Sequence, residues 1–292
     1  MDVQESLISA FIPMTTTCKN CGKDLHGKYC SSCGQKIILP EDKKLRHLVT
    51  EFFHHFTHLD GKFLKTLKKL LCFPGAVTRD ISMGITVPHF KLSALFLVGT
   101  IIYYLLPSNL VVGTPANTNY KLQLTNPEYG NWAADLASSK SRSQKITLQA
   151  LEARYNQRQH DYGKLLILLL IPMLIPVLWV ISKLVKKFNP DNFFTAYDLG
   201  VASLELNSII LYGFYLIAGI SIWLATLVYG SEIVSAVGTV IFLTAVLFLI
   251  LSFFKRAYRI LWWQALICLT LLIVAYVYIL NLFGLISFLI FI

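Results

Sequence analysis

Charged residues are scarce in this chain of 292 residues. Only 14% of the residues are Asp, Glu, Lys or Arg, whereas roughly a quarter are charged in ordinary soluble domains. Hydrophobic residues make up 55% of the chain, and long stretches after residue 164 carry no charge at all. This distribution excludes a single soluble core and is typical of a multi-pass membrane protein.

Catalytic and targeting patterns are also missing. The sequence contains no nucleophile beside a base, no paired-carboxylate site, no phosphate-binding glycine loop and no internal repeat. Asp2 and Glu5 stand where a signal peptide needs positive charge, and the apolar run 7–14 is short and contains Pro13. We therefore expect a protein that is not an enzyme and whose first span directs insertion.

Five apolar segments predict the transmembrane helices, at residues 91–112, 165–185, 200–228, 233–254 and 261–292. Pro172 and Pro176 predict a bend in the second. The last segment is longer than the roughly 20 residues that cross a bilayer, so it either tilts or folds back near Asn281 and Gly284. The predicted fold is an all-α integral membrane protein with about five transmembrane helices in a bundle over residues 91–292.

The basic residues predict the orientation of this bundle. The formal net charge is +10, and nineteen of the 26 Lys and Arg residues fall on one side of the predicted spans. The other seven lie between residues 121 and 164. The positive-inside rule then places the N-terminus in the cytoplasm and the C-terminus outside. The outer loop, 113–163, is expected to be a surface loop followed by a short exposed helix.

Four cysteines form the strongest local signal. Cys18, Cys21, Cys30 and Cys33 make two CxxC pairs eight residues apart, each followed directly by a glycine. This spacing predicts a small zinc ribbon within residues 1–40, with its metal site at 18–33 and a structural Zn²⁺ held by four thiolates. Disulfide pairing is the alternative, but it requires an oxidising compartment. We expect the ribbon to dock a protein partner, and we expect no nucleic acid.

A strongly amphipathic helix is predicted within the linker, 41–90. Phenylalanine and leucine side chains from Leu45 to Leu70 share one face, and histidines and lysines share the other. The helix either lies along the membrane surface or packs on the bundle. On its polar face, a set of four residues forms either a second metal site or a solvated surface. These four are His47, Glu51, His54 and His58.

Isolated polar and sulfur-containing residues complete the set of candidates. Glu205 and Asn207 lie inside the third predicted span, shortly after Asp198. They mark either a polar site in a transporter or channel, together with the proline bend, or a membrane boundary one turn further along the chain. Cys72 and Cys268 are expected to be packed thiols rather than ligands.

The order of these parts is similar to a known family. The phrase CKNCGKDLHGKYCSSCGQK, followed by LDGKFLKTLKKLLCFPG and a first span, resembles an uncharacterised family of zinc-ribbon membrane proteins typical of Bacteroidota. The resemblance covers residues 18–107 and implies a bacterial inner-membrane location. The predicted function is thus a multi-pass inner-membrane protein with a cytoplasmic zinc ribbon for docking or assembly.

Overall fold

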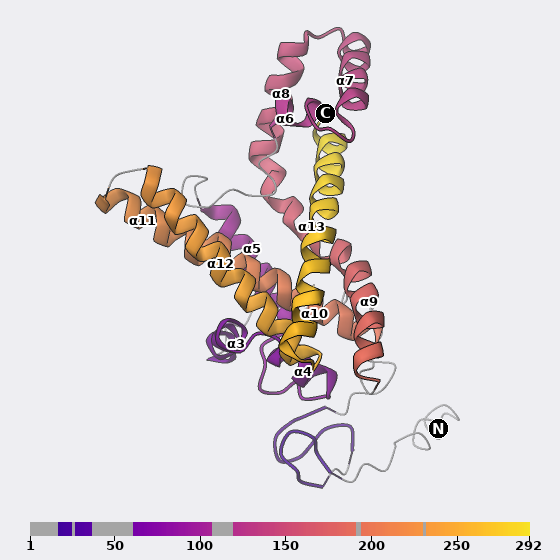
Figure 1. The fold of residues 1–292 in the computed structure, drawn as a ribbon, viewed down its shortest axis with the longest axis vertical. Helices are drawn as coiled ribbons and strands as arrows, with labels where there is room; N and C mark the ends of the chain where they lie inside the picture. The colour runs from indigo at the N-terminus through magenta and orange to yellow at the C-terminus, as the bar shows by residue number, and fades with distance from the viewer. Residues whose placement is uncertain (1–16, 25–26, 37–60, 107–118, 191–193, 230–231) are drawn as a thin grey trace, which may run out of the picture.

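The computed structural model describes residues 17–24, 27–36, 61–106, 119–190, 194–229 and 232–292. The described chain is mainly helical, and the molecule is elongated (Figure 1). A cysteine module, residues 17–24 and 27–36, lies at one end. A helical cap, residues 119–164, lies at the other end, where the chain reaches its C-terminus. A bundle of long apolar helices connects the two.

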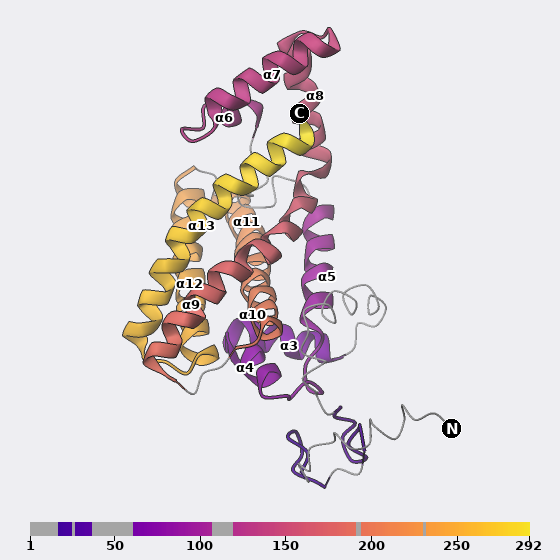
Figure 2. The ribbon, with the colours of Figure 1, turned by 90° about the vertical axis from the view of Figure 1, so that its right-hand side faces the viewer.

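The chain runs several times along the bundle, away from the module and back toward it (Figure 2). Helix α5 leads toward the cap, the segment η2–α9 returns, α10–η3–α11 leads away again, α12 returns, and α13 ends in the cap. The bounds are α3 Gly61–Cys72, α4 Ala76–Ser82, α5 Leu92–Leu105, α6 Tyr120–Leu124, α7 Gly130–Gln144, α8 Leu148–Tyr162, η2 Gly163–Leu169, α9 Leu170–Phe188, α10 Ala196–Ile209, η3 Ile210–Ala218, α11 Gly219–Tyr229, α12 Glu232–Ala257 and α13 Trp262–Phe291.

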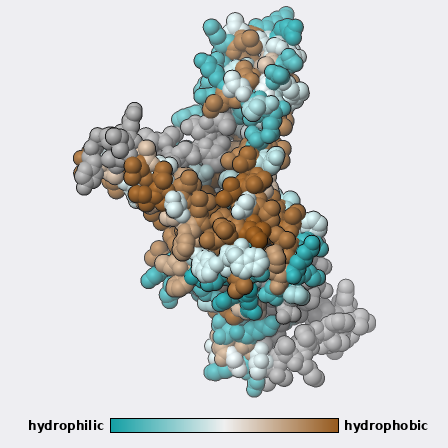
Figure 3. Space-filling view, viewed as in Figure 1, coloured by the Kyte–Doolittle hydropathy of each residue, from teal (hydrophilic) through white to brown (hydrophobic). Residues whose placement is uncertain are grey.

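Four helical stretches in the described residues are long and apolar enough to span a membrane. They are Leu148–Phe188, Ala196–Val228, Ala236–Ala257 and Trp262–Phe291. Their outward faces form an apolar band between two polar ends (Figure 3). The chain is thus a membrane-spanning protein. The first predicted span appears as α5, which is shorter at fourteen residues, so the predicted count of five stays a prediction.

The C-terminal segment is one continuous helix, α13. Its 30 residues correspond to about 45 Å, more than the roughly 30 Å hydrocarbon core of a bilayer. The alternative of a fold-back near Gly284 is therefore wrong. The additional length packs into the cap, where Phe288 and Phe291 lie against Tyr155 at ring distances of 5.8 and 6.2 Å.

The sequence predicted a surface loop followed by one short helix for residues 113–163, and this prediction is wrong for residues 119–162. Residues 119–162 form three helices, of which α8 is the expected one and α7 was not predicted. Helix α7 buries Ala133, Ala137 and Ser141, which recur every four residues on one face. These small side chains let α7 pack closely although its sequence is polar overall.

Helix α10 is the centre of the bundle, since twelve of its fourteen residues are buried. It continues through η3, a π-helical stretch, into α11, so the third predicted span is confirmed as a helix with an irregular middle. The second predicted span, 165–185, begins in the 3₁₀ stretch η2 and continues in α9, which has Pro176 inside it. The Ser203 hydroxyl of α10 donates to the Ile171 carbonyl in this proline-containing region (2.8 Å).

Candidate metal centre and its attachment to the bundle

The four cysteines of the module converge on one point. Their sulfur atoms all lie within 4.8 Å of one another. Cys18 Sγ is 3.6 Å from Cys33 Sγ, and Cys21 Sγ is 3.6 Å from Cys30 Sγ. Thiolates at about 2.3 Å from a tetrahedral ion are about 3.8 Å apart. The cluster therefore has the size and the donor set to hold one metal ion, and all four cysteines are free.

Two copies of the same backbone turn present these thiols. In the first, Gly22 N donates to Cys18 O (2.8 Å) and Cys18 N donates to Lys23 O (2.7 Å). In the second, Gly34 N donates to Cys30 O and Cys30 N to Gln35 O, both at 2.8 Å. The two glycines have φ of 73° and 72°, a left-handed conformation that favours glycine. Each glycine therefore lies where a side chain would strain the backbone.

Hydrogen bonds around the cluster favour a thiolate at one position. The side chain of Asn20 and the backbone N–H of Gln35 lower the pKa of Cys33 to about 6. The backbone at Lys23 acts in the same direction on Cys21, but desolvation and the neighbouring thiols outweigh it and raise the pKa of Cys21 to about 12. A metal ion would replace the protons of the remaining thiols on binding.

One side chain joins this module to the membrane bundle. Gln35 is buried, with 4% of its surface exposed. Its Nε2 donates to Gly84 O (2.8 Å) and Thr86 Oγ1 (3.1 Å), and its Oε1 accepts from the backbone N–H groups of Thr86 and Val87, both at 3.2 Å. The amide therefore uses both ends to fix the second CxxC turn on the segment between α4 and α5.

The segment between α3 and α5 also holds a buried acidic residue. Asp80 Oδ2 accepts from Lys69 Nζ at 2.5 Å and lies 3.0 Å from His89 Nε2. Burial lowers the pKa of His89 below its usual 6.5, the nearby charge of Lys69 lowers it further, and Asp80 opposes the shift. A neutral His89 that donates to Asp80 fits this arrangement, which ties the end of α3 to the segment before α5.

Glu205 connects the central helix to the turn after α3. Its side chain has no exposed surface. Oε1 accepts from Gly75 N (2.7 Å) and Oε2 accepts from Thr78 N (2.6 Å). The carboxylate thus caps the N-terminal end of α4 from another helix. The sequence left open a transport site or a membrane-boundary position, and the structure shows a buried contact between elements.

Asn207 and Asp198 make only local hydrogen bonds among the described residues. Asn207 Nδ2 donates to Ser203 O (2.9 Å) and Ser203 Oγ (3.3 Å) one turn earlier. Asp198 closes a capping box with Thr195, whose N–H and hydroxyl both donate to Asp198 Oδ2. Both side chains are buried, and each stabilises α10 itself.

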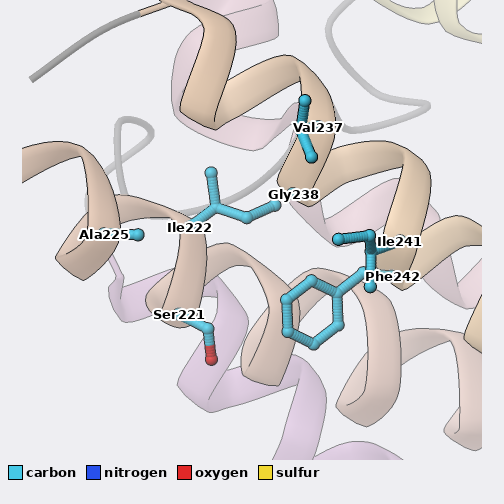
Figure 4. Close-up of a pocket in the computed structure, with 7 residues that line it drawn as sticks. All are labelled: Ser221, Ile222, Ala225, Val237, Gly238, Ile241 and Phe242. Carbon is cyan, nitrogen blue, oxygen red and sulfur yellow. The ribbon is translucent and has the colours of Figure 1, made fainter. Parts of the chain in front are cut away.

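An apolar groove lies between α11 and α12 (Figure 4). Its lining consists of Ser221, Ile222, Ala225, Val237, Gly238, Ile241 and Phe242. Neither Glu205 nor Asn207 belongs to it. The groove therefore gives no support to a polar path through those two residues.

The described part of the predicted amphipathic helix packs on the bundle. Helix α3 buries Phe63 and Leu70 in the main hydrophobic core, while Lys62 and Lys65 are exposed. For α3, the packing alternative is therefore confirmed. His47, Glu51, His54 and His58 lie outside the described residues. Cys268 is a buried thiol as predicted, but the prediction for Cys72 is wrong because that residue is exposed at the end of α3.

Sequence reasoning missed three of the residues that position the module, namely Gln35, Asp80 and His89. Gln35 stands one residue after the glycine of the second turn, the position that Lys23 takes in the first. This break in an otherwise repeated pattern was the available signal. No protein family, curated protein or solved structure that was compared matches this chain, so the family resemblance stays a prediction.

Proposed function

We propose that this chain is a non-enzymatic, multi-pass inner-membrane protein whose cysteine module is a structural zinc ribbon that serves docking or assembly. The observation that carries the proposal is the Gln35 contact with residues 84–87, which fixes the module on the bundle. A module held in this way offers a rigid surface with a defined position relative to the membrane. Four protein ligands would leave no open coordination position for substrate, which favours a structural ion.

The charge at the two ends of the molecule supports a cytoplasmic position for the module. Its described segments and those beside it at this end hold sixteen Lys and Arg residues and two Asp residues. These segments are 17–24, 27–36, 61–91, 183–187 and 255–259. The cap, residues 119–164, holds seven basic and four acidic residues. The positive-inside rule favours the more basic end on the cytoplasmic side, and the family resemblance favours a bacterial inner membrane.

The exposed face of the module offers a surface for a protein partner. Tyr29 has 62% of its surface exposed, and Lys19, Lys23 and Lys28 lie in the same module. An exposed aromatic side chain among lysines is a combination that suits an acidic protein surface with an apolar pocket. We propose that Tyr29 is the central contact of this surface.

The alternative function, a transporter or channel with a polar site at Glu205 and Asn207, is less well supported. Both oxygens of Glu205 accept backbone hydrogen bonds, and the Asn207 amide bonds one turn back along its own helix. Groups engaged in this way have little capacity left to bind an ion or substrate. A structural role accounts for both residues.

Metal analysis of purified protein tests the proposal directly. We expect about one zinc ion per chain, and loss of that ion in the variant Cys18→Ser/Cys33→Ser. The variant Cys72→Ser, which alters an exposed thiol outside the cluster, is the matched control and keeps the metal. A purified protein without stoichiometric zinc would overturn the metal assignment.

Affinity purification in mild detergent tests the docking role. We expect a specific co-purifying protein to be lost from both Cys18→Ser/Cys33→Ser and Tyr29→Ala, although the Tyr29→Ala protein retains zinc. If the wild type and both variants co-purify with the same set of proteins, docking through this face is contradicted. In that case the metal would serve the stability of the module alone.

A further inference from the structure

Helix α3 lies across the end of the bundle and does not run along it. Figure 1 shows this helix nearly end-on, whereas the long helices beside it are seen lengthwise. Arg256, in the last turn of α12, fixes the depth of the chain where α3 ends. Its Nη1 donates to Pro74 O at 3.3 Å, and its guanidinium lies 5.4 Å from the ring centroid of Phe73. Because Arg256 stands at the end of the apolar span Ala236–Ala257, α3 lies at the boundary of the apolar band.

One side of α3 faces the membrane-spanning region. Leu71 Cδ2 lies 3.8 Å from the position that a Cβ would take at Gly213, which is near the midpoint of the span Ala196–Val228. Leu64 precedes Leu71 by seven residues, so the two side chains lie about 20° apart around the helix. Leu64 has 69% of its surface exposed. It therefore points to the depth of the apolar band with little protein over it.

Three lysines follow Leu64 around the same helix. At about 100° per residue, Lys68, Lys65 and Lys62 lie about 40°, 100° and 160° from Leu64, on the side away from the buried face. All three are exposed. We call these three lysines the basic face of α3. A single helix carries them, so their arrangement relative to Leu64 follows from helix geometry alone.

The charge of the basic face is not neutralised by carboxylates in the described part of the chain. None of the ion pairs found there includes Lys62, Lys65 or Lys68, whereas Lys69 of the same helix binds Asp80. Helix α3 itself contains no acidic residue. A partner with several negative charges would therefore gain from contact with all three lysines.

The position of the basic face favours one kind of anionic partner. An acidic soluble protein would meet the lysines but would leave Leu64, which points toward the apolar band, uncovered. A phospholipid with net negative charge covers both, because its phosphate lies at the membrane boundary and its acyl chains extend along the apolar band. Lysine side chains at such a boundary reach the headgroups while their aliphatic stems lie on apolar surface.

We propose that the basic face of α3 is a binding surface for acidic phospholipid headgroups. Phosphate groups contact Lys62, Lys65 and Lys68, and Leu64 enters the acyl region beside them. Helix α3 thus packs on the bundle with one face and on the lipid bilayer with another. The surface includes no residue of the cysteine module, so it does not depend on the proposed docking function.

Native mass spectrometry of the intact protein in detergent, titrated with phosphatidylglycerol or phosphatidylcholine, tests the recognition of charge. We expect phosphatidylglycerol to bind more tightly. Lys62→Gln/Lys65→Gln/Lys68→Gln should weaken its binding about 100-fold, because each lysine near a headgroup contributes about a fivefold effect. The same triple substitution to arginine keeps the charge and should retain binding, which separates loss of charge from loss of fold.

A matched variant at the other end of the molecule controls for net charge. Lys121→Gln/Lys140→Gln/Lys145→Gln removes three charges from the cap, and we expect no change in phosphatidylglycerol affinity. Equal weakening by the two glutamine variants, or equal binding of the two lipids, would overturn the proposal. Displacement of the lipid by millimolar inorganic phosphate would show a simple anion site and would also overturn it. Unaltered lipid binding together with loss of a co-purifying acidic protein would assign the basic face to a protein partner instead.

A spin label on α3 tests the depth of the helix in bilayers that contain phosphatidylglycerol. A label on Leu64→Cys, in a Cys72→Ser background, should be more accessible to oxygen, which concentrates in the hydrocarbon, than to a water-soluble nickel complex. A label on Lys62→Cys in the same background should show the opposite order, and Cys72→Ser alone gives the signal from the remaining cysteines. Equal accessibility of the two labels to the nickel complex would contradict the placement of α3 on the bilayer.

Discussion

The carboxylate of Glu205 accepts a hydrogen bond from the backbone N–H of Thr78, with 2.6 Å between Oε2 and N. The two residues are 127 positions apart, one in the central helix and one at the start of α4. The same carboxylate also binds Gly75 N. A single buried side chain therefore fixes the α3–α4 turn on the membrane bundle. The segment that binds Gln35 of the cysteine module, residues 84–87, follows directly after α4.

Removal of this side chain is expected to destabilise the bundle. Glu205→Ala leaves the buried N–H groups of Gly75 and Thr78 without acceptors, and each such loss costs about 1–3 kcal/mol. We expect a decrease of roughly 3 kcal/mol or more in the free energy of unfolding, measured in detergent micelles. Glu205→Gln keeps one acceptor oxygen and should have a smaller effect.

A carboxylate in the cap provides the comparison for this change. Glu152 makes only a 3.9 Å ion pair with Lys121, so Glu152→Ala should change stability by less than about 0.5 kcal/mol. A Glu205→Gln protein that unfolds like the wild type but loses an ion or substrate flux in liposomes would contradict the structural role. It would restore the transporter alternative.

The turn at Gly75 is expected to tolerate no side chain. Gly75 has φ of 82°, and a Cβ there would lie 2.5 Å from Phe253 O and 2.9 Å from Ala257 N in α12. Because both contacts are with helix backbone, α12 or the turn must shift. Gly75→Ala should therefore lower the unfolding free energy by about 2 kcal/mol or more.

Gly61 is a suitable control for that substitution, since it begins α3 and a Cβ there would meet nothing within 4 Å. Gly61→Ala should be neutral or slightly stabilising. Thermal unfolding of the two variants in the same detergent is sufficient to compare them. Similar unfolding temperatures would show that the α3–α4 turn does not pack on α12 as described.

Hydropathy and cysteine spacing predicted the parts of the molecule that depend on local sequence. The second to fifth spans correspond to observed helices, and the four cysteines of the two CxxC pairs converge on one point. Helix α7 was missed because its packing face consists of alanine and serine, which give a weak hydrophobic period.

Contacts between distant segments could not be predicted from one sequence. Gln35 was not predicted to have a role, yet it bonds to residues about fifty positions further along. Glu205 was recognised as unusual because a carboxylate in a span is costly, but its partners are backbone N–H groups. Backbone donors have no residue-type signature, so the sequence alone could not indicate them.

Gln35→Ala is expected to release the cysteine module from the bundle without removing the metal. The substitution eliminates the acceptor for Thr86 N and Val87 N, so these amides should exchange hydrogen faster. Hydrogen–deuterium exchange of a peptide covering residues 84–90 measures the effect, and the zinc content should be unchanged.

Lys23→Ala is the internal control for Gln35→Ala, because Lys23 takes the same place in the first turn and is exposed. We expect its exchange in residues 84–90 to match that of the wild type. If Gln35→Ala also leaves the exchange unaltered, the module is attached by other contacts. The docking proposal would then lose the Gln35 contact on which it rests.

The stability of the segment before α5 is expected to depend on His89 and pH. The pKa of His89 in the folded protein is below the 6.5 of an unfolded chain, first because of burial and second because of Lys69. The unfolded state therefore binds more protons between these two values, and stability falls as the pH decreases through them. The stabilising contribution is fully present above the unfolded pKa and is lost as the pH falls through the folded one.

Unfolding temperatures between about pH 7.5 and about pH 5.5 test this dependence. His89→Gln has no titratable ring but keeps an N–H that can donate to Asp80, so its pH dependence should be weaker than that of the wild type. His160→Gln alters an exposed residue of the cap with 75% of its side chain accessible and should retain the full dependence. An unchanged slope in His89→Gln would show that His89 is not protonated on unfolding in this range, which would contradict its burial as a neutral partner of Asp80.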